Sequence, residues 1–132
     1  MMSFQSKASF PCDPASPGRA RSWVAEQISA ALTRQPAMPT ILDDAVLVVS
    51  ELVTNALRAG CSRADLNIEV DVDALRVGVI DDGPGVPVVQ VAQPGDVRGR
   101  GLFLVAALVS DWGVRTTENG KEVWAALPLL FW

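Results

Sequence analysis

An apolar stretch that ends in two acidic residues and a glycine-rich turn constrains the fold of this chain more than any other feature. Leu75 to Ile80 has the composition of a β-strand, and Asp81-Asp82-Gly83-Pro84-Gly85 follows it directly. A carboxylate at the end of such a strand can accept a hydrogen bond from an amine in an otherwise apolar pocket. Gly83 and Gly85 would let the backbone approach a planar ligand closely. The stretch therefore predicts a ligand site at one end of a sheet, and its simpler interpretation is a polar turn.

An amphipathic helix is predicted from about Thr40 to Gly60, since glycine commonly ends a helix. Apolar residues recur at helical spacing along one of its faces. Glu51, Asn55 and Arg58 are spaced four and three residues apart, so they lie together on another side. That side is either a functional surface or an ordinary solvated face with weak ion pairing.

A loop rich in glycine and arginine precedes another predicted helix, over 101–109. Gly99 and Gly101 stand where the loop becomes a helix, so free N–H groups and the helix dipole could hold a phosphate chain there. Arg98 and Arg100 add cationic donors to the same turn. The stretch over 86–98 contains prolines and has no periodicity, which is typical of a functional lid.

The remaining predicted elements complete one domain. They are a short edge strand near 3–10, a helix over 16–34 with Ser16 as N-cap and Pro17 in its first turn, strands over 65–72 and 75–80, and a hairpin of 112–117 with 122–127. We expect a flexible or edge-strand N-terminus over 1–12, a domain over 13–128 and an apolar tail over 129–132.

Composition excludes several classes of function. The chain has 132 residues, 49% of them hydrophobic, which suffices for one domain with one core. A formal net charge of -4 argues against a nucleic-acid partner, and no apolar run is long enough to cross a bilayer. The absence of histidine excludes Ser-His hydrolases and phosphorylation of a histidine on this chain. Cys12 and Cys61 are far apart in sequence and are expected to be free thiols of a cytoplasmic protein.

Three of these segments together resemble the nucleotide-binding boxes of the GHKL (Bergerat-fold) ATP-binding superfamily. They are Glu51-Leu52-Val53-Thr54-Asn55-Ala56, Asp81-Asp82-Gly83-Pro84-Gly85 and Gly99-Arg100-Gly101-Leu102-Phe103-Leu104. With Trp112-Gly113 and Gly120-Lys121-Glu122-Val123-Trp124, the pattern is most similar to the small bacterial anti-sigma-factor serine kinases. The resemblance extends from Phe10 to Leu127.

The resemblance implies a two-layer α/β sandwich, in which a mixed, mainly antiparallel sheet carries about three helices on one face and an ATP lid. It implies an anti-sigma factor with serine/threonine kinase activity, which binds a sigma factor and phosphorylates an antagonist protein. ATP and Mg²⁺ would be its cofactors, neither nucleic acid nor membrane would be a partner, and a homodimer is compatible with the family. One alternative is an adaptor that sequesters a protein without phosphoryl transfer. Another is an ATPase cassette detached from a histidine kinase, for which an acceptor histidine is missing.

The same resemblance assigns roles to individual residues. Glu51 would act as general base on an incoming hydroxyl, Asn55 as the magnesium ligand and Asp81 as acceptor for the adenine N6 amine. Further nucleotide contacts would come from Arg58, Gly83, Gly85, Arg98, Gly99, Arg100, Gly101 and Leu102.

Two positions depart from the family pattern. Arg58 is followed directly by Ala59, where the family usually has a histidine or another bulky polar residue, so a contact on the phosphate side is lost. Glu122 stands where the family has a threonine, whose hydroxyl assists the adenine-binding aspartate through water. If Glu122 faces the pocket, a second carboxylate near Asp81 is expected to weaken nucleotide binding.

Overall fold

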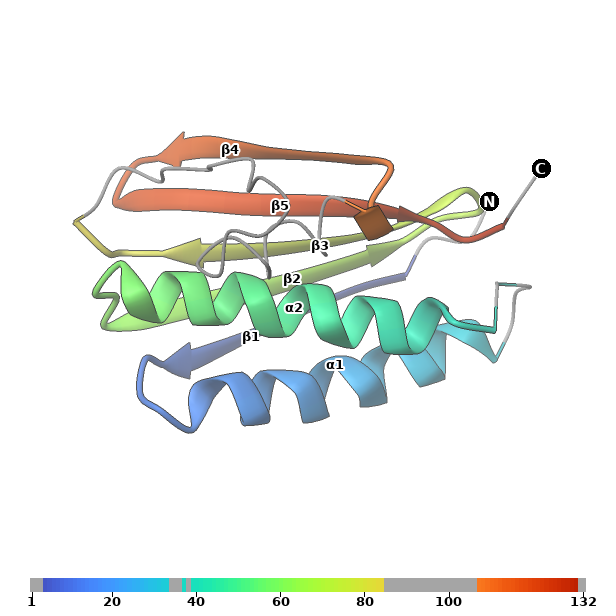
Figure 1. Cartoon of the computed structure of the whole chain (residues 1–132), viewed down its shortest axis with the longest axis horizontal. Helices are drawn as coiled ribbons and strands as arrows, with labels where there is room; N and C mark the ends of the chain where they lie inside the picture. Colours follow the sequence, from blue (N-terminus) through green and yellow to red (C-terminus); the bar gives the residue numbers. More distant parts are fainter. Residues whose placement is uncertain (1–3, 34–36, 38, 85–106, 131–132) are drawn as a thin grey trace.

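The computed structural model describes residues 4–33, 37, 39–84 and 107–130 (Figure 1). Its elements are β1 (Phe4–Pro11), α1 (Ser16–Leu32), α2 (Ile41–Arg58), β2 (Arg63–Val70), β3 (Ala74–Asp81), β4 (Asp111–Thr117) and β5 (Gly120–Pro128). The predicted lid over 86–98 and most of the predicted helix over 101–109 lie outside the described residues.

The described strands form one five-stranded sheet in the order β1-β2-β3-β5-β4. Each neighbouring pair in it is antiparallel, so the sheet is antiparallel across the described strands rather than mixed. Both described helices lie on the same face of this sheet (Figure 1). The predicted two-layer α/β architecture is therefore confirmed, with two helices described where about three were expected.

The core lies between the helices and the sheet. Helix α2 contributes a long apolar stripe to this core. The stripe consists of Ile41, Ala45, Val48, Val49, Leu52, Val53 and Ala56. Strand β2 alternates as predicted, since Leu66, Ile68 and Val70 are buried and the residues between them are more exposed. Helix α2 ends at Arg58, and Gly60 follows with a φ of 81°, a left-handed conformation that glycine adopts without strain. The predicted helix end is thus confirmed.

The start of α1 differs from the prediction. The residue that precedes the helix is Ala15, so Ser16 is its first residue and not the N-cap. The Ser16 hydroxyl accepts a hydrogen bond from the backbone N–H of Asp13 at 2.9 Å and donates to the carbonyl of Pro11. These bonds satisfy backbone groups of the segment that leads into the helix, so the hydroxyl does not cap the helix itself.

The turn between β2 and β3 also lies earlier than predicted, at Asp71 to Asp73. The Asp71 carboxylate accepts hydrogen bonds from the backbone N–H groups of Ala74 at 2.8 Å and Asp73 at 2.7 Å. These two bonds, that of Ala74 foremost, lower the pKa of Asp71 below its usual value. An aspartate that caps its own turn therefore sets where the two strands begin and end.

The two cysteines form a disulfide, so the prediction of free thiols is wrong. Strand β1 pairs with β2 so that Pro11 lies opposite Arg63, and the N–H of Cys12 donates to the carbonyl of Ser62 at 3.0 Å. This pairing brings Cys12 beside Cys61, with 5.8 Å between their Cα atoms. The bond connects the segment before α1 to the turn after α2.

Among the described residues, no helix is long and apolar enough to cross a membrane.

Removal of the disulfide should lower the free energy of unfolding without changing the fold. The bond closes a loop with a sequence separation of 49 residues, and a loop of this size is typically worth about 2–4 kcal/mol. We expect the Cys12→Ser/Cys61→Ser variant to show this loss in urea denaturation. Reductant should produce a comparable loss in the wild type and none in the variant. A wild-type protein whose stability is insensitive to reductant would contradict the assignment.

Candidate functional site

A buried ion pair joins the ends of β3 and β5. Asp81, the last residue of β3, lies opposite Lys121 in the register of the two strands. The Lys121 Nζ lies 2.9 Å from the Asp81 Oδ1, and the two side chains are only 7% and 2% exposed. The backbone N–H of Gly83 donates to the same carboxylate oxygen at 2.8 Å. Asp81 is therefore a buried charge with two compensating donors, at the position where the sequence predicts a ligand site.

Gly120 is the residue that allows this arrangement. A Cβ added to Gly120 would lie 1.9 Å from the carbonyl oxygen of Asp81, far inside van der Waals contact. The start of β5 consequently passes so close to the end of β3 that only glycine fits. Because Lys121 follows Gly120 directly, this close approach places its side chain beside the Asp81 carboxylate.

The C-terminal turn of α2 packs against the turn that follows β3. A Cβ on Gly83 would lie 2.9 Å from the carbonyl oxygen of Ala59, so glycine is needed here to let the two turns meet. Within α2, the N–H of Ala59 donates to the carbonyl of Asn55 at 3.0 Å, which places Asn55 one turn before this contact. The structure thus brings the helix end that carries Asn55 to the strand end that carries Asp81.

Asp82 holds the junction between the end of α2 and the end of β3 by hydrogen bonds. Its carboxylate accepts bonds from the Ser62 hydroxyl and from the backbone N–H groups of Ser62 at 2.8 Å and Arg63 at 3.1 Å. These bonds, the one from the Ser62 hydroxyl above all, lower the pKa of Asp82 to about 2. This role of Asp82 was not predicted, although an aspartate directly after a strand is a recognisable signal for such capping.

Glu51 and Asn55 are partly exposed on α2, and Arg58 is exposed. Among the described residues, neither Glu51 nor Arg58 takes part in an ion pair, and the partial exposure of this side fits both a functional surface and an ordinary solvated face. The other predicted nucleotide contacts are not described by the structure. They are Gly85, Arg98, Gly99, Arg100, Gly101 and Leu102.

The donor set fits a magnesium ion that is held mainly by its substrate. No group of three or more His, Cys, Asp or Glu side chains among the described residues could hold a metal ion. Asn55 is partly exposed on α2, and its side-chain amide oxygen is of the type that coordinates a hard cation. Mg²⁺ commonly takes one or two protein ligands and completes its coordination with water and phosphate oxygens. Asn55 is therefore compatible with the role predicted for it.

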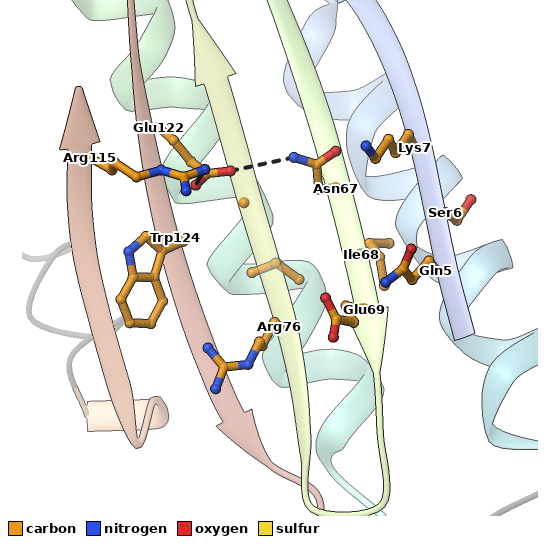
Figure 2. A pocket seen from close by; sticks show the side chains of 12 residues that line it. Gln5, Ser6, Lys7, Asn67, Ile68, Glu69, Arg76, Arg115, Glu122 and Trp124 are labelled. Carbon is orange, nitrogen blue, oxygen red and sulfur yellow. Dashed lines mark hydrogen bonds and ion pairs between the residues drawn. The ribbon is translucent and has the colours of Figure 1, made fainter. Parts of the chain in front are cut away.

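Glu122 lies on the opposite face of the sheet from Asp81, so it does not place a second negative charge beside the base site. It is paired in register with Ile80, one residue before Asp81, and successive residues of a strand point to opposite faces. Arg115 lies 2.8 Å from its carboxylate, and the Asn67 amide donates to it at 3.4 Å (Figure 2). The residue that the structure places beside Asp81 is Lys121, for which no role was predicted.

The open face around Glu122 forms a groove of about 450 Å³ that is separate from the Asp81 site. The groove runs across all five strands, and the Arg76 guanidinium lies 5.9 Å from the centre of the Trp124 ring within it (Figure 2). Trp124 covers the backbone of Gly113, since a Cβ there would come within 2.8 Å of the indole. Its ring therefore packs on this face and not in the predicted site.

Gly120→Ala should unfold the site. The added methyl would overlap the Asp81 backbone, which cannot move without breaking the pairing of β3 with β5, so we expect a loss of roughly 3 kcal/mol or more in unfolding free energy. Gly18→Ala is the matched control, because a Cβ on Gly18 meets only the end of the Arg21 side chain at 3.6 Å. Its effect should stay within about 1 kcal/mol. Equal effects of the two substitutions in thermal denaturation would contradict the close approach.

Acid should weaken the junction through Asp82. A carboxylate whose pKa is lowered by folding stabilises the protein above its unfolded pKa of 3.8, and this stabilisation is lost as the pH falls toward about 2. Asp82→Asn should therefore flatten the fall in unfolding free energy between pH 4 and 2. Glu118→Gln, in the exposed turn between β4 and β5, is the control and should follow the wild-type curve. A variant at Asp82 that follows the wild-type curve as well would contradict this role.

Comparisons with known proteins bear on the fold of this chain. The family profile of the histidine kinase-like ATPase domain matches residues 11–127. A nucleotide-free form of the catalytic domain of histidine kinase ThkA superposes with a TM-score of 0.57, at 15% identity over 94% of this chain and 97% of that chain. The histidine kinase domain of the Erythrobacter litoralis EL346 blue-light activated kinase gives 0.47, at 24% identity over 86% of this chain and 61% of that chain. Among curated proteins, none is significantly similar in sequence. The likeness to ThkA shows the fold.

Proposed function

Because the chain belongs to the histidine kinase-like ATPase domain family, we propose that it binds ATP and phosphorylates serine or threonine on a protein substrate. In this proposal it is a bacterial anti-sigma factor that silences a sigma factor by binding it. Phosphorylation of a small antagonist protein would control that binding. We place it in the cytoplasm, where these partners act.

One observation supports this proposal more than any other. The helix α2 carries Glu51 and Asn55 one turn apart, and its end packs against the turn after Asp81 through Gly83 and Ala59. The candidate general base and the candidate metal ligand thus lie on α2, and the candidate adenine-binding carboxylate lies on β3, whose end contacts the end of α2. Phosphoryl transfer depends mainly on such positioning and on charge stabilisation.

Each residue has a defined task in the proposed reaction. The Asp81 carboxylate would accept a hydrogen bond from the adenine N6 amine, and Asn55 would hold Mg²⁺. The ion would supply positive charge that offsets the charge of the phosphates. Glu51 would accept the proton of the attacking serine or threonine hydroxyl as the γ-phosphoryl group moves to that oxygen. The acceptor serine or threonine would lie on the antagonist protein.

Glu51→Gln should separate binding from chemistry. The amide keeps the size of the side chain and cannot accept the proton, so phosphorylation of a cognate antagonist should fall roughly 10²–10⁴-fold. The affinity for ATP with Mg²⁺, measured by calorimetry, should remain unchanged. Glu26→Gln on the exposed side of α1 is the control and should preserve both quantities.

The outcomes of this experiment separate the alternatives. Transfer at the wild-type rate in Glu51→Gln would reject Glu51 as the base. A wild-type protein that binds ATP and its partner without phosphorylating it would replace the kinase with an adaptor. No heat with ATP at millimolar concentration, from folded protein, would reject nucleotide binding.

A further inference from the structure

We propose that the disulfide between Cys12 and Cys61 is a redox switch, and that its reduction by a thiol weakens the binding of ATP. The inference rests on the proposed function, in which Asn55 and Asp81 contact ATP and Mg²⁺. It deepens that function because it assigns a regulation to the same site. Neither the motif pattern nor the family match gives the two cysteines a role.

The disulfide lies at the end of the helix that carries the candidate metal ligand. The N–H of Cys61 donates to the carbonyl of Ala56 at 3.3 Å, and the N–H of Gly60 donates to that of Leu57 at 3.0 Å. This pair of bonds is the Schellman motif that closes a helix at its C-terminus. The covalent partner Cys12 therefore holds a residue that belongs to the cap of α2.

Hydrogen bonds lead from the disulfide to the end of β3. Ser62 follows Cys61 directly, and its carbonyl accepts the N–H of Cys12 at 3.0 Å. The backbone N–H of Ser62 donates to the Asp82 carboxylate at 2.8 Å, and the Ser62 hydroxyl donates to the same group. Any freedom that reduction gives to this turn therefore reaches the strand end that carries Asp81.

Reduction should loosen this junction and thereby weaken the ligand. The intact bond closes a loop with a sequence separation of 49 residues, so it excludes many arrangements of the chain around the helix end. Without the bond, fewer molecules hold the junction in the arrangement that the site requires. The apparent affinity of a ligand falls in proportion to the fraction of molecules that are competent to bind it. Oxidising conditions should therefore favour the nucleotide-bound protein.

A thiol can reach the bond in the folded protein, because both cysteines are partly exposed. The thiolate of one reductant molecule attacks either sulfur, the S–S bond breaks, and the other cysteine leaves as a thiolate. A second reductant thiol then breaks the mixed disulfide and frees the first cysteine. In balance, the reductant thiols are oxidised to a disulfide, and the protein disulfide takes up their electrons and protons to become a pair of thiols.

The compartment proposed for this protein favours a switch over a purely structural bond. Glutathione and thioredoxin keep thiols reduced in the cytoplasm, and disulfides there are usually transient, catalytic or redox-sensing. Under this proposal the bond forms when the surroundings become oxidising.

The test measures the affinity for ATP with Mg²⁺ by calorimetry, on the wild type with the bond intact and after reduction by glutathione. The reduced protein should bind ATP roughly fivefold or more weakly, as is typical of coupling between two sites. Cys12→Ser/Cys61→Ser should bind like the reduced wild type and should not respond to glutathione. By linkage, saturating ATP should shift the equilibrium with glutathione toward the protein disulfide by the same factor.

A matched variant separates the local effect from a general loss of stability. Val70→Ala removes buried volume at the end of β2 that pairs with Leu75, whereas the other end of this strand pairs with Asp81. The oxidised variant should bind ATP like the oxidised wild type and should keep the response to glutathione. Circular dichroism establishes that each form is folded before the titrations are compared.

Hydrogen exchange gives a readout that needs no nucleotide. The backbone amides over 56–63 should exchange faster after reduction of the wild type, because the turn that they form is held by the disulfide. Alkylation and mass measurement establish how much of the folded protein glutathione has reduced.

Each outcome decides the matter. Equal affinities of the folded oxidised and reduced wild type, or tighter binding by the reduced form, would overturn the switch and leave ATP binding in place. A bond that glutathione does not reduce in the folded protein, or amide exchange over 56–63 that reduction does not change, would also overturn it. So would an oxidised Val70→Ala variant that binds as weakly as the reduced wild type. No binding of ATP to either folded form would overturn both the proposed function and this inference.

Discussion

The antiparallel pairing of β3 with β5 is the interaction on which the rest of the site depends. Its register sets Asp81 opposite Lys121 and Ile80 opposite Glu122. A slip of one residue would exchange the two faces of β5, and in one direction of slip a glutamate would lie where the lysine now neutralises a buried carboxylate. The pairing thus determines the sign of the charge beside Asp81 as well as the shape of the sheet.

The end of α2 depends on that pairing and is fixed to it in several independent ways. Packing of Gly83 on Ala59, the hydrogen bonds of Asp82, and the covalent link through Cys61 all act within the few residues after the helix. A helix anchored so firmly at one end keeps Glu51 and Asn55 at a constant distance from the strand end. Such preorganisation lowers the entropy that a ligand would otherwise have to offset on binding.

Local patterns in the sequence were sufficient to predict most elements, because periods of two and of about 3.6 residues report burial directly. The end of α2 just before Gly60 and the buried face of β2 followed from such patterns. Properties that depend on distant partners were not predictable in this way. Cys12 meets Cys61 only because β1 pairs with β2, and periodicity alone could not say whether Lys121 or Glu122 faces Asp81. The cap predicted at Ser16 failed because its hydroxyl bonds to Pro11 and Asp13 instead.

The separation of 40 residues between Asp81 and Lys121 has a consequence for how this domain can vary. Bringing the two strand ends together closes a long loop, and each doubling of such a loop costs only about 0.6 kcal/mol in chain entropy. Residues added or removed between the two strands therefore change the free energy of closure very little. Outside the residues predicted to contact nucleotide and the strand β4, this connection can change in length while the register of β3 with β5 still sets Lys121 opposite Asp81.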